Sequence, residues 1–150
     1  MIMAGRPRLI AMAREQYGLE LNQGPFGIDS RPALIGAKYA EAADVGEAYH
    51  RAVFSAYWEQ AADISDLDTL AGIAVAVGLD REAFLAALDD PAFIDAVDAD
   101  IAQAHAYGLN AVPALVFADR YLVSGAQPYP VLKQVAAQVR AELEKGEPGS

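Results

Sequence analysis

Few side chains in this sequence have the types and spacing that chemistry requires. The sequence contains no cysteine, which excludes structural disulfides, thiolate zinc sites and a cysteine nucleophile within these residues. Its two histidines, His50 and His105, lack a carboxylate partner and metal-ligand spacing, and both fall beside apolar residues of helical patterns. We therefore expect both to be partly buried structural histidines.

The acidic and glycine-rich candidates also have simpler explanations. Asp95 and Asp98 would share a helix face, as two ligands of a hard cation do, but the sequence offers no third ligand and a solvated acidic face is expected. The segment 24–27, Gly-Pro-Phe-Gly, lacks the following Lys-Ser/Thr of a phosphate-binding loop. Asp29 and Ser30 most simply cap a helix. No metal and no cofactor is predicted.

Four aromatic residues gather on one predicted helix: Tyr49, Phe54, Tyr57 and Trp58. Such clusters usually belong to a core, because aromatic side chains bury large apolar areas. A binding role is the alternative, since ligand pockets are also lined by aromatic side chains.

The stretch from Gly108 to Gln127 predicts a β-hairpin. Gly108 ends a helical pattern, Ala114 to Phe117 forms an apolar run, a short Ala-Asp-Arg connection follows, and Tyr121 to Val123 forms a second β-prone run. Pro113 directly precedes the first strand, and its missing N–H fits a strand start or an edge. Only about 5–6% of X–Pro bonds in folded proteins are cis, so a trans bond is the statistical default here.

Helical patterns fill most of the chain before the hairpin. Asp80 and Asp90-Pro91 are helix start signals, and Ser30 and Ser65 are further predicted caps. The expected helices cover residues 7–17, 31–43, 47–60, about 66–77, a short segment after Asp80, a segment from Pro91, and about 130–144.

Composition narrows the class of protein. The 150 residues are 54% hydrophobic and 21% charged, which fits one globular domain with a sizeable core. The formal net charge is -10 and the eleven basic residues are scattered, so nucleic-acid binding is disfavoured. We find neither a transmembrane run nor a signal peptide, so we expect no membrane association and a cytoplasmic location.

The order helix, Gly-Leu-x-Ala-Val-Pro-x-Leu-Val-Phe, then Tyr-x-Val-Ser-Gly-Ala-Gln-Pro resembles the carboxy-terminal part of the DsbA-like thioredoxin family, and most closely its FrnE-type members. Ile-Asp-Ser-Arg at 28–31 supports the resemblance, which covers roughly residues 8–141. It implies a mostly α fold with a small β-hairpin, of the thioredoxin-like DsbA type with a helical insertion. The amino-terminal βαβ half of that fold, with its Cys-x-x-Cys segment, has no counterpart, so we expect a fragment, a truncated gene product or a degenerate member.

The resemblance implies a domain organisation. It assigns residues 1–27 to a leading helix and loop, 28–108 to the helical insertion, 109–145 to the carboxy-terminal half of the thioredoxin-like domain, and 146–150 to a tail. Removal of the opening half would expose one edge of the strand at 114–117. We expect either that the chain forms a homo-oligomer through this edge or that the helix at 7–17 packs across it.

The resemblance also implies a function and site residues. In the intact family, a low-pKa cysteine attacks a substrate disulfide and a second cysteine resolves the mixed disulfide. Beside them a cis-proline loop, here Ala111, Val112 and Pro113, pairs with a polypeptide substrate, and the loop at Asp29 and Ser30 lies near the active site. The implied function is a disulfide oxidoreductase or isomerase acting on polypeptide or thiol substrates. Without cysteine, the chain as given has no catalytic residue and should be inactive.

Two other functions remain open. The related 2-hydroxychromene-2-carboxylate isomerases and kappa glutathione transferases share the fold and can use serine as the key residue, so a missing segment with a lone serine would favour them. A non-catalytic helical interaction module with a vestigial hairpin is the third interpretation. It would be favoured if these residues were the complete natural product.

Overall fold

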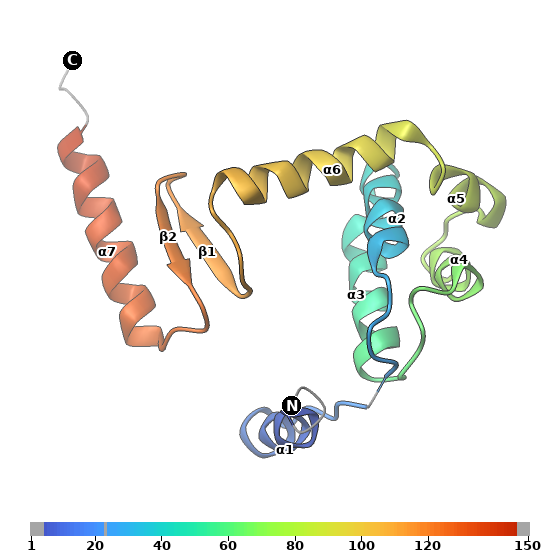
Figure 1. The fold of residues 1–150 in the computed structure, drawn as a ribbon, viewed down its shortest axis with the longest axis horizontal. Helices are drawn as coiled ribbons and strands as arrows, with labels where there is room; N and C mark the ends of the chain where they lie inside the picture. Colours follow the sequence, from blue (N-terminus) through green and yellow to red (C-terminus); the bar gives the residue numbers. More distant parts are fainter. Residues whose placement is uncertain (1–4, 23, 147–150) are drawn as a thin grey trace. The chain divides into compact units, whose positions relative to one another are not determined.

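The computed structural model describes residues 5–22 and 24–146, and Figure 1 follows its elements along the chain. Within these residues the structure is mostly helical with one antiparallel pair of strands. The elements are α1 (Gly5–Tyr17), α2 (Arg31–Ala42), α3 (Gly46–Trp58), α4 (Leu67–Ala76), α5 (Arg81–Ala87), α6 (Pro91–Ala106), β1 (Ala114–Phe117), β2 (Tyr121–Ser124) and α7 (Tyr129–Gly146). None of the described helices is long and apolar enough to span a bilayer. The predicted mostly α fold with a small hairpin is confirmed.

The chain divides into two compact units, Met1–Asp98 and Ala99–Ser150. The division falls inside α6 rather than in a loop. The insertion boundary expected at 108 lies beyond that point, in the turn after α6. Of the expected tail at 146–150, Gly146 closes α7 and residues 147–150 lie outside the described part of the chain, as do residues 1–4 of the leading segment.

Aspartates cap α4 and α5 of the first unit. The carboxylate of Asp66 accepts a hydrogen bond from the Thr69 amide at 2.8 Å, and Asp80 caps α5 in the same way through Ala83. The hydroxyl of Thr69, and after it the amide, lowers the pKa of Asp66.

One predicted cap was wrong, and a second holds its position without a capping hydrogen bond. Ser65 lies one residue before the true cap of α4, because Asp66 occupies that position with its carboxylate in reach of the first turn. Ser30 holds the cap position of α2 but makes no capping hydrogen bond. The Asp29 carboxylate accepts from the Arg31 amide at 2.9 Å instead. In both places a carboxylate displaced a hydroxyl as the acceptor.

The core of the first unit lies among α2, α3, α4 and α5. Its largest fully buried side chains are Tyr49, Phe84 and Leu70. Phe84 packs against Tyr49 and Tyr39 with ring centroids 5.7 and 6.2 Å apart. Gly36 lets α2 come close to these rings, since a Cβ there would lie 2.5 Å from the Tyr49 hydroxyl oxygen. The core therefore fixes how α2 and α3 pair, and this pairing positions the cavity described below.

The second unit is built on the hairpin. Ala114 pairs with Ser124 and Phe117 with Tyr121, in the predicted antiparallel arrangement. Arg120 donates its amide to the Phe117 carbonyl at 3.1 Å and closes the turn. The Tyr107 hydroxyl, just after α6, donates to the Asp119 carboxylate at 3.0 Å, and Tyr121 of β2 donates to Glu142 of α7. Both flanking helical segments are thus bonded to the hairpin.

Candidate functional site

The Val112-Pro113 loop is the first candidate site. Its peptide bond is cis, as the family resemblance implied. The Gly125 amide donates to the Pro113 carbonyl at 2.8 Å, and the Gln127 side chain donates to the Ser124 carbonyl at 2.9 Å. The Ser-Gly-Ala-Gln segment that carried the resemblance therefore holds the loop in place from the far strand.

The loop is open to solvent and has unused backbone groups. Ala111, Val112 and Pro113 are all exposed, and Val112 is 93% exposed. Among the described residues, no group hydrogen-bonds the backbone N–H or C=O of Val112. An extended polypeptide could pair with these groups as a short added strand.

Asp29 and Ser30 lie in the other unit, at the start of α2. Both are exposed, and the Ser30 hydroxyl has no hydrogen-bond partner in the part of the chain that the structure describes. Arg31 beside them forms an ion pair with Asp98 of α6 at 2.7 Å. The Asp98 carboxylate is therefore already paired with the Arg31 guanidinium. The described residues contain no cluster of three potential metal ligands.

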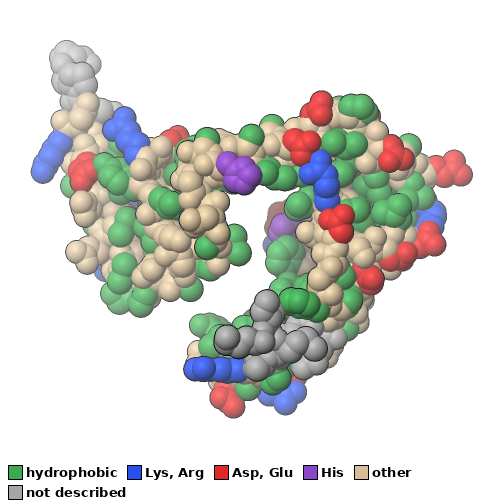
Figure 2. All heavy atoms as spheres, in the orientation of Figure 1, with side chains coloured by type: hydrophobic (Ala, Val, Ile, Leu, Met, Phe, Trp, Pro, Cys, Tyr) green, Lys and Arg blue, Asp and Glu red, His purple; other side chains and the backbone are tan. Residues whose placement is uncertain are grey.

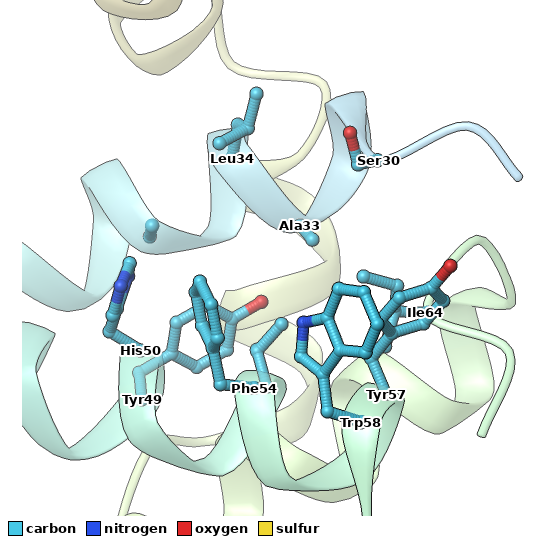
Figure 3. A pocket seen from close by; sticks show the side chains of 11 residues that line it. Ser30, Ala33, Leu34, Tyr49, His50, Phe54, Tyr57, Trp58 and Ile64 are labelled. Carbon is cyan, nitrogen blue, oxygen red and sulfur yellow. The ribbon is translucent and has the colours of Figure 1, made fainter. Parts of the chain in front are cut away.

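A cavity of about 230 Å³ lies between α2 and α3 (Figure 3). The view shows Ala33 on the side of α2 that faces the rings of Phe54 and Trp58 on α3. The full lining is Ser30, Ala33, Leu34, Ala37, Tyr49, His50, Val53, Phe54, Tyr57, Trp58 and Ile64. Ser30 is thus the one predicted site residue that lines this cavity.

The aromatic cluster of α3 divides between the core and the cavity wall. Tyr49 is buried in the core, whereas Phe54 is 53% exposed at the cavity. Tyr57 packs on Trp58 with ring centroids 4.9 Å apart, and its hydroxyl donates to the Pro25 carbonyl at 3.2 Å. One side of α3 therefore contributes to the core, and another side lines the cavity.

Tyr49 also has an unusual hydroxyl. It is fully buried and has no hydrogen-bond partner among the described residues. Burial raises the pKa of Tyr49, because the phenolate would lose its hydration there. The Tyr49 side chain therefore stays uncharged, and its ring forms part of the apolar lining of the cavity.

The two histidines correct the sequence interpretation. We expected partial burial, yet His50 and His105 are both exposed. His50 stacks on Phe54 with ring centroids 4.7 Å apart, at the rim of the cavity. For His50 the apolar neighbour Phe54 lies beside the imidazole and leaves it exposed.

The charged side chains on the described surface do not gather into a basic patch. Figure 2 shows acidic and basic side chains interspersed on the visible face, without a continuous basic stripe. Several of them form exposed ion pairs, such as Arg14 with Glu20 at 2.5 Å. The Val112-Pro113 loop, residues 111–113, contains no charged side chain.

A profile of the DSBA-like thioredoxin domain matches residues 8–137 of this chain. The chain belongs to the DsbA-like thioredoxin family. A crystal structure of a probable DsbA oxidoreductase from Streptomyces coelicolor is 30% identical, with a TM-score of 0.77 over 98% of this chain and 62% of that one. The uncharacterized protein YwbO of Bacillus subtilis is 29% identical over 119 residues, which are 75% of this chain and 58% of that protein.

The DsbA-like chain therefore spans about three fifths of the length of these relatives. The profile match includes both candidate sites, the start of α2 and the Val112-Pro113 loop. Sequence reasoning missed the α2 side of the cavity, where Ala33 and Ala37 lie one helical turn apart. Two alanines at i and i+4 opposite an aromatic helix were the signal that could have indicated it.

Proposed function

We propose that this chain is the polypeptide-binding part of a thiol-disulfide oxidoreductase or isomerase of the DsbA family. The observation that carries the proposal is the loop at Val112, whose backbone N–H and C=O are exposed and unpaired among the described residues. Strand addition to such a backbone binds an extended polypeptide with little regard to its sequence. A protein that acts on many disulfide-bonded substrates needs this kind of recognition.

These residues do not supply the thiol chemistry. Disulfide exchange requires a thiolate to attack and a second thiol to resolve the mixed disulfide. The 150 residues contain no cysteine, so we infer that this chain binds but does not turn over a disulfide substrate. Ala111, Val112, Pro113, Asp29 and Ser30 are substrate-binding residues in this proposal, and none is catalytic.

The finer assignments belong to the same proposal. Ile-Asp-Ser-Arg at 28–31, the Val-Pro loop and Ser-Gly-Ala-Gln support a FrnE-type member that acts in the cytoplasm. The proposed domain organisation treats residues 28–108 as the helical insertion and 109–145 as the closing half of the thioredoxin-like domain. Polypeptide or small thiol compounds are the proposed substrates.

The binding proposal is tested with Val112→Asp. The probe is an unfolded polypeptide whose cysteines have been reduced and carboxymethylated, so that only non-covalent binding is measured. A carboxylate at this loop would lose hydration against the incoming backbone. We expect the dissociation constant to rise at least about tenfold, a loss of about 1.4 kcal/mol.

The matched control is Val75→Asp, at a 51% exposed valine of α4 that lines neither candidate site. It should bind the probe like the unchanged chain. Equal affinity for both variants would refute a binding role for the loop. In a parallel assay of insulin reduction by dithiothreitol, the chain should not raise the uncatalysed rate, and any turnover would contradict the assignment as a binding part.

A further inference from the structure

The α2/α3 cavity exists because the two helices present side chains of very different size. Ala33 and Ala37 of α2 each offer one methyl group, whereas α3 offers the rings of Phe54, Tyr57 and Trp58. Large side chains on α2 would fill the space, as close packing normally requires. The alanines leave a slot with an aromatic wall.

The volume of the slot matches one ring system. An engineered apolar cavity of about 150 Å³ is known to take up benzene. The cavity here measures about 230 Å³, enough for a six-membered ring with its linking methylene. It is too small for an extended apolar segment.

The residues that line the slot disfavour a charged ligand. None of the eleven lining residues is Lys, Arg, Asp or Glu. A charged group moved from water into such a lining would lose hydration without a partner. Four lining residues have polar groups without a hydrogen-bond partner in the described part of the chain: the Ser30 hydroxyl, the Trp58 indole N–H, the His50 imidazole and the buried Tyr49 hydroxyl. They tolerate a neutral ring, with or without a hydroxyl.

The mouth of the slot allows the ring to remain attached to a chain. Leu34 is 49% exposed and Phe54 is 53% exposed, and His50 stacks on Phe54 at the same rim. The slot is therefore open at the surface rather than sealed in the core. A side chain can enter from outside while its backbone stays in solvent.

We propose that this slot binds one uncharged aromatic side chain of a polypeptide substrate. The inference rests on the proposed function, in which the substrate is a polypeptide, and adds a preference for phenylalanine or tyrosine. Stacking on Phe54 and Trp58 adds to the apolar area that the ring buries. Recognition of this ring is separate from backbone pairing at Val112.

The chain contains its own reporter for the test, because Trp58 is its only tryptophan and lines the slot. Short capped glycine peptides with one central Phe, Leu, Ala or Arg are titrated while tryptophan fluorescence is followed. We expect the Phe peptide to change Trp58 emission and to bind at least about tenfold more tightly than the Ala peptide. The Arg peptide should bind no better than the Ala peptide. Equal affinity for the Phe, Ala and Arg peptides would overturn the proposal.

Variants locate the binding. Ala37→Leu fills the slot and should abolish the preference for Phe, whereas Ala42→Leu, at an exposed position of the same helix, should keep it. Phe54→Ala removes an exposed wall residue and should also weaken the Phe peptide, so it decides the question if Ala37→Leu does not fold. Retention of the Phe preference in folded Ala37→Leu or in Phe54→Ala would refute the slot.

The Val112→Asp background separates the two proposals. The Phe preference should persist there, because the slot residues are unchanged. If Val112→Asp leaves unfolded-polypeptide binding intact while the slot variants lose the Phe preference, the proposed loop fails and the slot stands. If the slot variants have no effect while Val112→Asp weakens binding, only the slot proposal fails.

Discussion

At the scale of single residues, Gly36 shows how a small side chain determines the packing of a core. A Cβ built there would lie 2.5 Å from the Tyr49 hydroxyl oxygen and 2.7 Å from a Phe84 ring carbon. Tyr49 and Phe84 are 1% and 0% exposed, so neither ring can move aside into solvent. The buried Tyr49 hydroxyl thus lies against the one position of α2 that has no side chain.

Gly36→Ala is expected to destabilise the first unit by about 1–3 kcal/mol, the usual cost of overpacking a close-packed core. Chemical denaturation followed by circular dichroism measures the change. Gly72→Ala is the matched control, since a Cβ there meets nothing within 4 Å and the residue lies inside α4. It should stabilise by about 0.5–1 kcal/mol, because alanine is the better helix former. Equal effects of the two substitutions would contradict the steric argument.

At the scale of elements, the turn between β1 and β2 contains two residues that are unfavourable for its backbone conformation. Ala118 and Asp119 have φ values of 51° and 54°, the left-handed region at both central positions of the turn. Hairpin turns of this kind favour Asn or Gly, because a Cβ is strained in that region. Asp119 is partly compensated by the hydrogen bond from the Tyr107 hydroxyl, whereas Ala118 has no side-chain group that could bond.

Ala118→Asn should therefore stabilise the hairpin by about 0.5–1 kcal/mol, since asparagine tolerates the left-handed region better than alanine. Slower amide hydrogen exchange in β1 and β2 is the expected readout. The same change at Ala102, an exposed position of α6, should destabilise instead, because asparagine is a poorer helix former. Faster exchange in Ala118→Asn would show that the turn gains nothing from the replacement.

The elements themselves were largely predictable from the sequence. Asp80 and Asp90-Pro91 start helices as expected, and the hairpin register follows from two β-prone runs around a short turn. Ser65 was the wrong cap, and Ser30 holds its cap position without a side-chain bond. At both helix starts a neighbouring carboxylate accepts the hydrogen bond instead, and local patterns cannot rank such competitors. The cavity was only half predictable, because it depends on which face of α2 meets the aromatic side of α3. Helical periodicity alone does not give that pairing.

At the scale of the whole molecule, the chain combines a helical unit that has its own core with a unit in which two strands carry the sheet. In the described residues β1 pairs only with β2, so its other edge has no strand partner. Leu115 of β1 is 45% exposed, and a two-stranded sheet is marginal in water. Unpaired edges of this kind promote association between copies.

We therefore predict that the chain self-associates through β1. Sedimentation over a range of concentrations should show a mass that rises with concentration. Leu115→Lys places a charge on the strand and should shift the equilibrium to monomer, as charged residues do at natural sheet edges. Leu67→Lys, at a 46% exposed leucine that begins α4, should leave it unchanged. A concentration-independent monomer for the unchanged chain would contradict the prediction.

The division of the chain inside α6 limits where members of the family can recombine their domains. Helical hydrogen bonds link each amide to the carbonyl four residues earlier, so amides just after Ala99 are bonded to carbonyls just before it. A cut between Asp98 and Ala99 would create two new helix ends and leave these amides and carbonyls without hydrogen-bond partners. Recombination between family members is therefore expected to transfer α6 whole and to join the sequences in the turn at Gly108, where the backbone already leaves the helix with a φ of 71°.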